Sequence, residues 1–415
     1  MSDTAMQTAS KEALEEFRAR VRAWMVDHLP PAGDTSLSDR DLQRIIFDAG
    51  FAGLAFPSEY GGAGLTLDHH KAFYDVASEL DRQVPTTLMV SIGMLGPTIL
   101  DCGSPAAKAR FLPPLLRGDE LWMQLLSEPR GGSDMAGSIT RLTRDGDTFV
   151  LNGTKMWSSE AHNADFGLAL CRSDWDVPKH RGLSMIAVPL QGTPGLTINR
   201  IRGAGGELKE YCEEFFDDVS LPAENLIGEL NHGWAVAQRL LFHERNATGN
   251  IGYGYLADRR KYRPTSFTPQ SPEMIARTAA SRGVGAACSS AIAESFIESV
   301  VVPLTSARMM RGMQVGTHKG QWGSLSKLQS SNYSHRSVRT ALIAAGASGV
   351  MWDGDEIETD NPGTVWLESR GITIAGGSSE MQRNIISERL LGLPREPDPS
   401  REMPFSEMLR TLKER

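Results

Sequence analysis

The spacing of apolar residues changes twice along this 415-residue chain, and the change limits the folds that it can adopt. In the first third, apolar residues recur at steps of three and four, as Leu14, Phe17 and Val21 do, which predicts amphipathic helices. Residues 122–230 carry short strand-like runs between turn residues, which predicts a small β domain. From Gly233 onward the helical spacing returns. Helices, then strands, then helices predict an α+β chain.

Glycine and proline set the expected ends of the helices. A helix that starts at Asp41 is expected to end at Gly50, because glycine suits the position after a helix C-terminus. The helix over Ala106–Leu112 is expected to stop at Pro113-Pro114, because proline removes a backbone donor. Four helices, with a loop at Arg259–Ser271, are expected in the C-terminal part: Ala235–Tyr253, Pro272–Leu304, Gly323–Ala345 and Met381–Leu391.

Two turn dipeptides in the middle block predict antiparallel hairpins. Thr148–Leu151 is strand-like, with Asp145-Gly146 before it and Asn152-Gly153 after it. Asp-Gly and Asn-Gly pairs favour the tight turns of hairpins. Further strands are expected at Gly167–Cys171, Leu183–Val188, Leu196–Asn199 and Val219–Leu221.

Charge and composition argue against several classes of protein. The formal net charge of −8 disfavours a nucleic-acid binder and a polybasic membrane-surface protein. Four scattered cysteines disfavour a disulfide scaffold and a structural zinc site, and no histidine pair with metal-ligand spacing is evident. The first residues lack a secretory leader, and apolar stretches such as Thr86–Leu100 are too short to span a membrane. We therefore expect a cytoplasmic protein with no metal and no membrane or nucleic-acid partner.

The run from Gln124 to Asp134, QLLSEPRGGSD, has the features of a ligand-binding loop. Its glycines let backbone N–H groups approach a ligand closely, and Ser127 and Ser133 add hydroxyl groups. An ordinary turn rich in glycine and serine would have the same composition. The run by itself therefore leaves a binding loop and a plain turn as equal alternatives.

A second run, Asn152–Ser159, places a tryptophan before two serines at a strand end. Trp157 is suited to stack on a flat heteroaromatic ring, to which Ser158 and Ser159 are suited to hydrogen-bond. A hairpin with a core tryptophan explains the same residues, and for this run alone it is the better explanation.

Together the two runs resemble the flavin-binding β domain of the acyl-CoA dehydrogenase family, in which (S/T)-E-P-x-x-G-S-D is followed by N-G-x-K-x-W-x-(S/T). Three further segments resemble other parts of that family: Gly50–Gly64, Phe215–Gly228 and Ile374–Ile386. The resemblance implies a helical N-domain (1–121), a central β-barrel-like domain (122–232) and a C-terminal four-helix bundle (233–415). It also implies that FAD binds between the domains and across a subunit interface, and that the Cα–Cβ bond of an acyl-CoA thioester is oxidised.

The same resemblance assigns flavin contacts by matching position. Gln124, Leu126 and Ser127 fall where family members contact the flavin, the last two at its pyrimidine ring. Trp157 would pack on the flavin, and Ser159 would hydrogen-bond near N5.

The catalytic base is expected on the first helix after the β domain. Many family members carry it just before the glycine of the C-terminal segment, but the matching position here is Gly376, which has no side chain. Isovaleryl- and long-chain acyl-CoA dehydrogenases place a glutamate, followed by arginine, on that helix, and Glu244-Arg245 resembles this site. On a helix Glu244 shares a largely apolar face with Leu240, so its pKa would rise toward the range useful for proton abstraction. A solvated Glu-Arg pair, or a carboxylate satisfied by the Thr248 hydroxyl, is the alternative.

Glu380 is the rival carboxylate. Ser379 and Gln382 fit a capping box, so a helix is expected to begin beside it. The resemblance places Ser378 and Glu380 at the adenosine part of FAD, and we interpret Glu380 as a cofactor contact or a surface residue before a base. The Gly376 N–H would donate to the thioester carbonyl and stabilise the charge that develops as the α-proton leaves.

The residues that hold phosphate groups are only partly assigned. By position Gly132 and Ser133 would face the FAD pyrophosphate or the pantetheine of the substrate. Arg245 would lie near the CoA path, with a plain surface charge as the alternative. The family's Arg-Phe-Gly motif, whose arginine reaches the FAD pyrophosphate of a neighbouring subunit, is missing. Candidate substitutes without a clear pattern are Arg259, Arg260, Arg308 and Arg311.

The sequence thus predicts an FAD-dependent acyl-CoA dehydrogenase with Glu244 as base and electron-transfer flavoprotein as acceptor. The absence of a side chain at Gly376 favours a branched, cyclic or bulky acyl group. We expect a homotetramer or an α2β2 heterotetramer, since loss of the arginine motif is compatible with a partner chain that supplies the contact. Two alternatives stay open: an acyl-CoA oxidase or flavin monooxygenase on the same fold, and a supporting subunit of a heteromeric dehydrogenase.

Overall fold

The computed structural model describes residues 13–204, 208–257, 271–318, 321–351 and 361–413. Its contacts divide the chain into two compact units. The first contains the chain up to Arg200, then Glu210–Tyr262 and the segment from Pro399 on; the second contains Ile201–Lys209 and Arg263–Asp398. The loop expected at Arg259–Ser271 lies, up to residue 270, outside the described residues.

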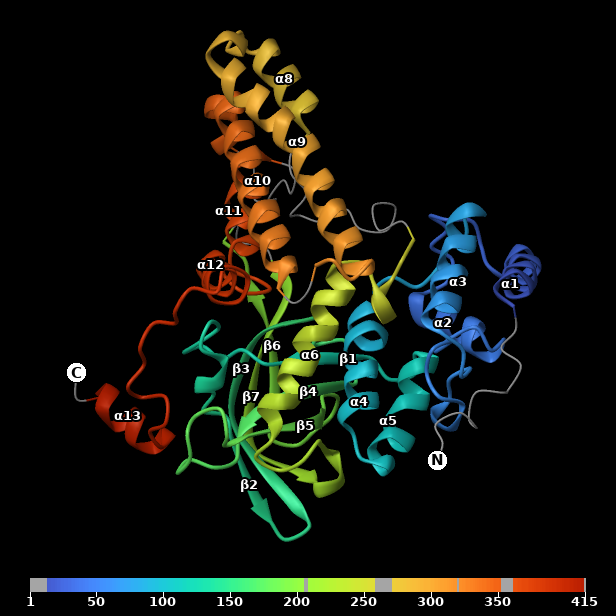
Figure 1. Cartoon of the computed structure of the whole chain (residues 1–415), viewed down its shortest axis with the longest axis vertical. Helices are drawn as coiled ribbons and strands as arrows, with labels where there is room; N and C mark the ends of the chain where they lie inside the picture. The colour runs from blue at the N-terminus through green and yellow to red at the C-terminus, as the bar shows by residue number, and fades with distance from the viewer. Residues whose placement is uncertain (1–12, 205–207, 258–270, 319–320, 352–360, 414–415) are drawn as a thin grey trace. The chain divides into compact units, whose positions relative to one another are not determined.

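Amphipathic helices open the first unit. On α1, Phe17, Val21 and Met25 are fully buried at steps of four. The predicted helix is therefore present, but Leu14, which was expected on its buried face, is exposed. The helices that precede the sheet are α1 (Leu14–His28), α2 (Asp39–Asp48), α3 (Leu67–Glu79), α4 (Gly96–Cys102) and α5 (Pro105–Arg117) (Figure 1).

The C-terminus of α2 confirms the predicted glycine stop. Gly50 has a φ of 77° and donates its N–H to Phe47 O at 2.8 Å. The next N–H, of Phe51, donates to Ile46 O at 2.9 Å, which completes the Schellman pattern.

The predicted stop of α5 at Pro113-Pro114 is wrong, because the helix continues to Arg117. Two backbone donors are lost, but Leu112 and Leu115 continue one buried apolar face past the prolines and pack in the core. The helix ends instead at Gly118, which has a φ of 82°.

The described strands form an eight-stranded sheet in the order β6-β7-β3-β2-β4-β5-β8, with β1 parallel to β4. Helices α4, α5 and α6 (Gly233–Thr248) contribute to the core cluster that contains Leu168 and Met185 of β4 and β5. A second cluster contains Val188 and Phe216. The strands are β1 (Trp122–Leu125), β2 (Arg141–Asp145), β3 (Thr148–Ser159), β4 (Phe166–Arg172), β5 (Leu183–Pro189), β6 (Leu196–Arg202), β7 (Leu208–Pro222) and β8 (Leu226–Ile227).

One of the two predicted hairpin turns is present. The turn at Asp145-Gly146 connects β2 to β3, and Asp145 of β2 pairs with Thr148 of β3. Asn152-Gly153 is not a turn: β3 runs through it with a register shift, and Gly153 has a φ of 143°. A glycine inside a strand often marks such a bulge, and pairing with β7 on both sides of it keeps the chain extended.

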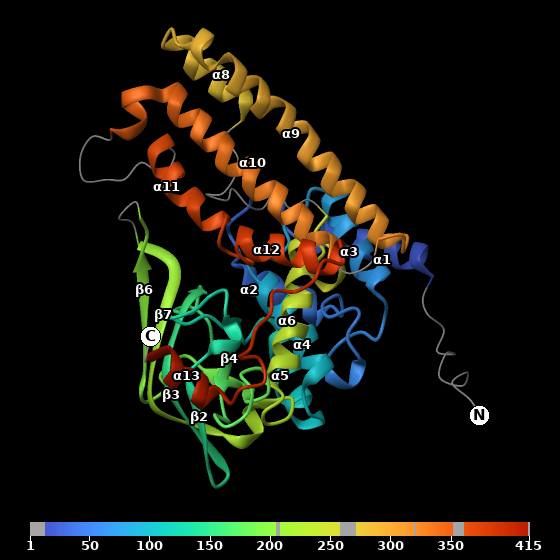
Figure 2. The same cartoon turned by 60° about the vertical axis from the view of Figure 1, so that its left-hand side comes forward.

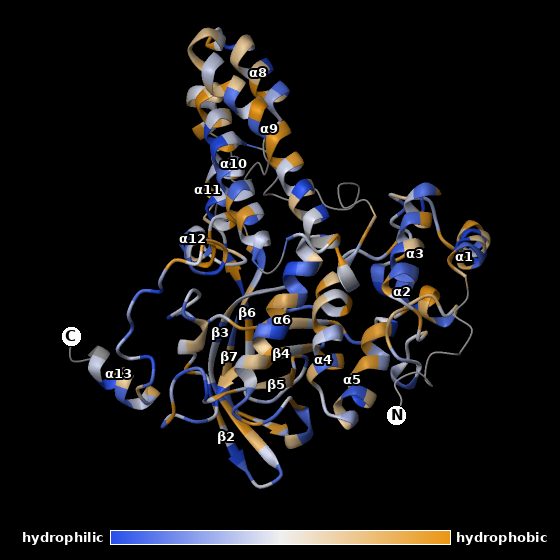
Figure 3. Cartoon of the chain, viewed as in Figure 1, coloured by the Kyte–Doolittle hydropathy of each residue, from blue (hydrophilic) through white to orange (hydrophobic). Residues whose placement is uncertain are grey.

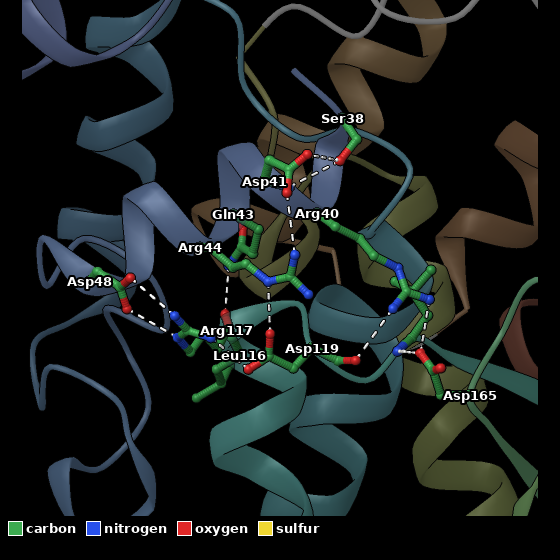
Figure 4. Close-up of polar contacts among 11 residues, drawn as sticks. Ser38, Arg40, Asp41, Gln43, Arg44, Asp48, Leu116, Arg117, Asp119 and Asp165 are labelled. Atoms are coloured by element: carbon green, nitrogen blue, oxygen red, sulfur yellow. Dashed lines mark hydrogen bonds and ion pairs between the residues drawn. The ribbon is translucent and has the colours of Figure 1, made fainter. Parts of the chain in front are cut away.

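Figure 4 shows how α2 is tied to the segment that leads into the sheet. Arg44 Nε donates to Asp119 Oδ1 at 2.8 Å, just after α5. Arg40 Nη2 donates to Asp165 Oδ2 at 2.8 Å, and the same carboxylate oxygen accepts the Leu121 N–H. These half-exposed pairs orient α2 more than they stabilise it.

The last described helix, α13 (Phe405–Lys413), belongs to the first unit. Phe405 is fully buried, with the Arg172 guanidinium 4.1 Å from its ring centroid, and its N–H donates to Val177 O at 2.9 Å. The sequence did not predict this helix.

The second unit is mainly helical, and α9 and α10 are its longest helices. Its α-helices are α8 (Pro272–Ser281), α9 (Gly285–Gln314), α10 (Trp322–Ala345), α11 (Pro362–Ile372) and α12 (Ser379–Ile385). Helix α10 packs against α9 and α11, as both views show (Figure 1 and Figure 2). The single helix predicted over Pro272–Leu304 is wrong, because Gly283, with a φ of 69°, ends α8. Helix α11 was not predicted.

Candidate active site

Helix α6 carries Glu244 beside strand β1. Gln124 Nε2 donates to Glu244 Oε2 at 3.2 Å. Desolvation of the half-buried side chain raises the pKa of Glu244, against the smaller opposing effects of the Gln124 bond and the Arg245 charge. The Thr248 hydroxyl donates its proton to Arg245 O at 3.1 Å, so the alternative in which Thr248 satisfies the carboxylate is not realised. A desolvated carboxylate is what a general base near neutral pH requires.

A second bulge, near the end of β3, changes the direction in which the side chains of this strand point. Met156 pairs with Glu213 and Ser158 with Cys212, so Trp157 has no pairing partner on β7. Trp157 has a φ of 68°, and its side chain is 56% exposed although it is large and aromatic. A bulky residue at positive φ is strained and persists only where its surroundings impose it, which is common at functional sites.

The two runs singled out in the sequence are joined by the backbone. The Met156 N–H donates to Ser127 O at 3.0 Å. The glycine-rich loop thus lies beside the bulge, and Leu126 and Ser127 lie next to Trp157's strand. Ser159 is exposed at the end of that strand.

A buried ion pair beneath these residues holds them in place. Lys155 Nζ donates to Glu128 Oε1 at 2.9 Å and to Leu126 O at 3.1 Å, and neither charged group is more than 5% exposed. Glu128 also accepts the N–H groups of Ile139 and Thr140 and the Ser138 hydroxyl. The nearby Lys155 charge and these hydrogen bonds outweigh desolvation and lower the pKa of Glu128 to about 2. Sequence reasoning assigned no role to either residue, although both stand inside the two motifs.

The residues of this unit fit a flat, phosphate-bearing cofactor. The Oε1 atom of Gln124 is buried without a hydrogen-bond partner in the described part of the chain, so a donor is expected to reach it. A Cβ at Gly132 would meet open space, and Ser133 beside it is exposed. A cavity of about 140 Å³ lies between this loop and α13, with Arg130 and Met408 in its lining.

The C-terminal segment of the second unit is a glycine turn before α12. Gly376 and Gly377 have φ of 67° and 89°, and Gln382 Nε2 donates to both of their carbonyl oxygens, at 3.1 and 3.2 Å. The N-cap is Ser378, whose hydroxyl accepts from Met381 N, so the capping box predicted from Ser379 is wrong by one residue. The Gln382 side chain hydrogen-bonds to the glycine turn and not to the N-cap residue, as a capping box would require.

The glycine turn keeps Gly376 open. Gly376 is exposed, and its N–H makes no hydrogen bond among the residues that the structure describes. A Cβ there would have only Lys327 within 4 Å, yet the positive φ disfavours any side chain. Glu380 is exposed and lies 3.5 Å from Arg383 Nη1.

Comparison with known proteins identifies the fold and the chemistry. Three family models match: the N-terminal domain of acyl-CoA dehydrogenase over residues 11–119, its middle domain over 124–219 and its C-terminal domain over 275–391. Acyl-CoA dehydrogenase IpdE1 of Mycobacterium tuberculosis is 35% identical over 404 residues, which cover 92% of this chain and 98% of the relative. The chain belongs to the acyl-CoA dehydrogenase family.

Solved structures agree with this membership. The Tcur3481-Tcur3483 steroid ACAD has a TM-score of 0.66 and 25% identity, covering 92% of this chain and 98% of its own. A glutaryl-CoA dehydrogenase from Mycobacterium smegmatis in complex with FADH2 has a TM-score of 0.60 and 21% identity, covering 93% and 96%. The predicted fold is confirmed, as a helical N-terminal domain, a central β-sheet domain and a C-terminal helical domain. The chain is an oxidoreductase of an FAD-dependent family, and the domain boundaries at residues 121 and 232 stay predictions.

Two further ligand groups, a pyrophosphate and a metal ion, find little support in the described residues of this acyl-CoA dehydrogenase. Of the four arginines considered for the pyrophosphate, Arg308 and Arg311 are exposed on α9, and Arg259 and Arg260 lie outside the described residues. Among the described residues, one group has ligand atoms within 4.8 Å of one another, as a metal site requires: Glu160, His162 and Glu210. Glu210 already pairs with Arg200 at 2.7 Å, which competes with a cation.

Proposed function

We propose that this chain catalyses FAD-dependent α,β-dehydrogenation of an acyl-CoA with Glu244 as the base. The observation that carries the proposal is the half-buried Glu244 carboxyl, which is held by Gln124, three residues before the loop residue Ser127. One hydrogen bond therefore connects the base to the strand that leads into the cofactor loop. The raised pKa of Glu244 suits a group that takes a proton and later releases it.

The chain's own residues perform the proton part of the reaction. Glu244 takes the α-proton, and Gly376 stays the predicted N–H donor to the thioester oxygen from its family position alone. FAD, when bound, supplies the acceptor for the hydride that leaves Cβ, so two hydrogens are removed and a C=C bond forms. Leu126, Ser127, Trp157 and Ser159 would hold the flavin.

A bulky, cyclic acyl group is the substrate class that we infer. Gly376, expected near the flavin from its family position, carries no side chain, and the solved relatives include a steroid ACAD at 25% identity. The direct test is to add cyclic, branched and straight-chain acyl-CoAs to the FAD-loaded protein without oxygen and follow loss of the oxidised-flavin absorption. Reduction by a cyclic acyl-CoA at least as fast as by straight chains supports the proposal, whereas reduction by none contradicts it.

The electron acceptor separates the two enzyme classes on this fold. We infer electron-transfer flavoprotein as acceptor, so turnover in air without it should form little hydrogen peroxide. Stoichiometric peroxide would favour an acyl-CoA oxidase instead.

An exposed apolar stripe on α9 supports assembly with further chains. Figure 3 shows apolar residues along this helix. In the described part of the chain, α9 is also long and apolar enough at Gly285–Met309 to cross a membrane by length and composition, but only 17% of that window is buried and it lies in the matched C-terminal family domain. An exposed apolar patch of this kind is typical of an interaction surface, and we infer that further chains cover it. The stripe consists of Phe296, Ile297, Val300, Val301 and Leu304.

We expect Ile297→Asp to dissociate the assembly, because a charge in an apolar interface loses its hydration. Ile297→Ala is the matched control, since it keeps the stripe apolar. Light scattering after size-exclusion chromatography measures both, for the chain alone and with a homologous partner chain. If the Asp variant forms an assembly of the same mass as the wild type, α9 is not part of the interface.

A further inference from the structure

Beneath the bulge at Trp157 lies a carboxyl group for which the family reaction has no obvious use. Glu214 on β7 is fully buried, and the Ser158 hydroxyl donates to its Oε2 at 3.0 Å. Its Oε1 has no partner among the described residues. Burying a carboxyl group in a sheet interior costs free energy unless hydrogen bonds compensate for the lost hydration.

The bulge reverses the alternation of side chains along β3. Lys155 points inward, Trp157 is exposed, and yet the next residue, Ser158, is buried again while Ser159 is exposed. Without the bulge the alternation would continue, and Ser158 would face outward and Ser159 inward. The outward position of Ser159 therefore depends on Ser158 staying inside.

Polar anchors hold both sides of the bulge. On the N-terminal side, Lys155 is bonded to Glu128 and to the Leu126 carbonyl. On the C-terminal side, Ser158 is bonded to Glu214, which is also the residue directly opposite Lys155 in the β3–β7 register. Trp157, with its strained φ, lies between these two anchors.

We propose that Glu214 is a positioning residue, which holds Ser158 inside the sheet and thereby keeps Trp157 and Ser159 turned toward the flavin. The inference rests on the proposed function, because it concerns residues that would hold FAD. Glu214 acts as a hydrogen-bond acceptor in a fixed place and does not touch the reacting atoms.

The protonation of Glu214 gives this role a pH signature. Burial raises the pKa of Glu214 to about 7, against smaller effects of the Ser158 bond and the Lys155 charge, while Glu213 adds to the rise. The titratable groups around it are Lys155 on β3 and Cys212 and Glu213 on β7. The native state thus keeps a proton that the unfolded chain releases near pH 4.5, so the free energy of unfolding falls as the pH rises from about 4.5 to about 7.

The test compares variants that keep or remove the acceptor, with the apoprotein and added FAD. Glu214→Gln keeps an acceptor oxygen for Ser158, so FAD affinity and the visible flavin spectrum stay near those of the wild type, and stability depends less on pH between 5 and 7. Glu214→Leu and Ser158→Ala each remove the bond, and we expect FAD affinity to fall about tenfold, which corresponds to about 1.4 kcal/mol. The matched control is Glu213→Gln, one residue away on the half-exposed side of the same strand.

A purely structural role would give a different result. It would lower the melting temperature of the Leu and Ala variants but leave FAD affinity and the flavin spectrum unchanged well below that temperature. That result, or a Gln variant as impaired as the Leu variant, overturns the inference. Failure of the wild type itself to bind FAD would contradict the proposed function instead, so the two failures are distinguishable.

Discussion

Flavin reduction by an acyl-CoA is expected to slow by about 10²–10⁴-fold in the Glu244→Gln variant, while FAD stays bound. Glutamine keeps the shape of the side chain and an acceptor oxygen for Gln124, but it cannot take the α-proton. Because burial raises the pKa of Glu244, the wild-type rate falls as the pH drops through that raised pKa. The variant loses this pH dependence. Stopped-flow absorption under anaerobic conditions measures both effects.

Two further variants make this test specific. Gln124→Ala removes a hydrogen bond that favours the ionised form of Glu244, so the pH profile of reduction moves to higher pH. Glu380→Gln, at the rival carboxylate, is expected to weaken FAD binding without loss of proton abstraction. If Glu380→Gln stops reduction and Glu244→Gln does not, the base has been assigned to the wrong residue.

The second large effect is expected at the buried ion pair. Lys155→Met leaves the Glu128 carboxylate buried without its cation, which costs about 3–5 kcal/mol of unfolding free energy. The variant also removes the donor to the Leu126 carbonyl in the proposed flavin loop, so we expect FAD affinity to decrease as well as stability. Denaturant unfolding of the apoprotein and FAD titration provide the two measurements.

A partly exposed ion pair provides the control for Lys155. Lys71 and Asp75 form an i,i+4 pair on α3 in which Lys71 is 53% exposed, and the Lys71 ammonium also lies 4.9 Å from the Tyr255 ring centroid, so we expect Lys71→Met to lower stability by about 1 kcal/mol or less. Adding Glu128→Gln to Lys155→Met should recover part of the loss, because it removes the unpaired charge. Equal losses in the Lys155 and Lys71 variants would show that the buried pair is not a stabilising anchor.

Local signals predicted the parts of the fold that depend on neighbouring residues alone. Gly50 and Asp145-Gly146 act within a turn of their own segments, and both features were present in the structure. Pro113 and Asn152-Gly153 misled, because tertiary packing of the Leu112–Leu115 face and pairing with β7 outweighed the local preference. Helix α13 went unpredicted because its anchor, Phe405, packs on Arg172, far away in the chain.

The candidate site follows the same division. The two motifs were recognised as a pair, and the bond between Met156 and Ser127 places them side by side. The motifs did not reveal the polar contacts beneath them: Lys155 on β3 binds Glu128 in the loop after β1, and Ser158 binds Glu214 on β7. Such partners have no spacing rule in sequence, since only the strand pairing and the path of the loop after β1 bring them together.

The place of α13 in the chain constrains how the protein is made. The first unit is completed only by the segment from Pro399 on, whereas the chain of the second unit, Arg263–Asp398, leaves the ribosome earlier. During synthesis the position beside Arg172 therefore stays unfilled until Phe405 emerges, and the nascent first unit exposes apolar surface for that time. The first unit is therefore the last to be completed, although most of its residues are made first, and partly folded states with exposed apolar surface are prone to aggregate.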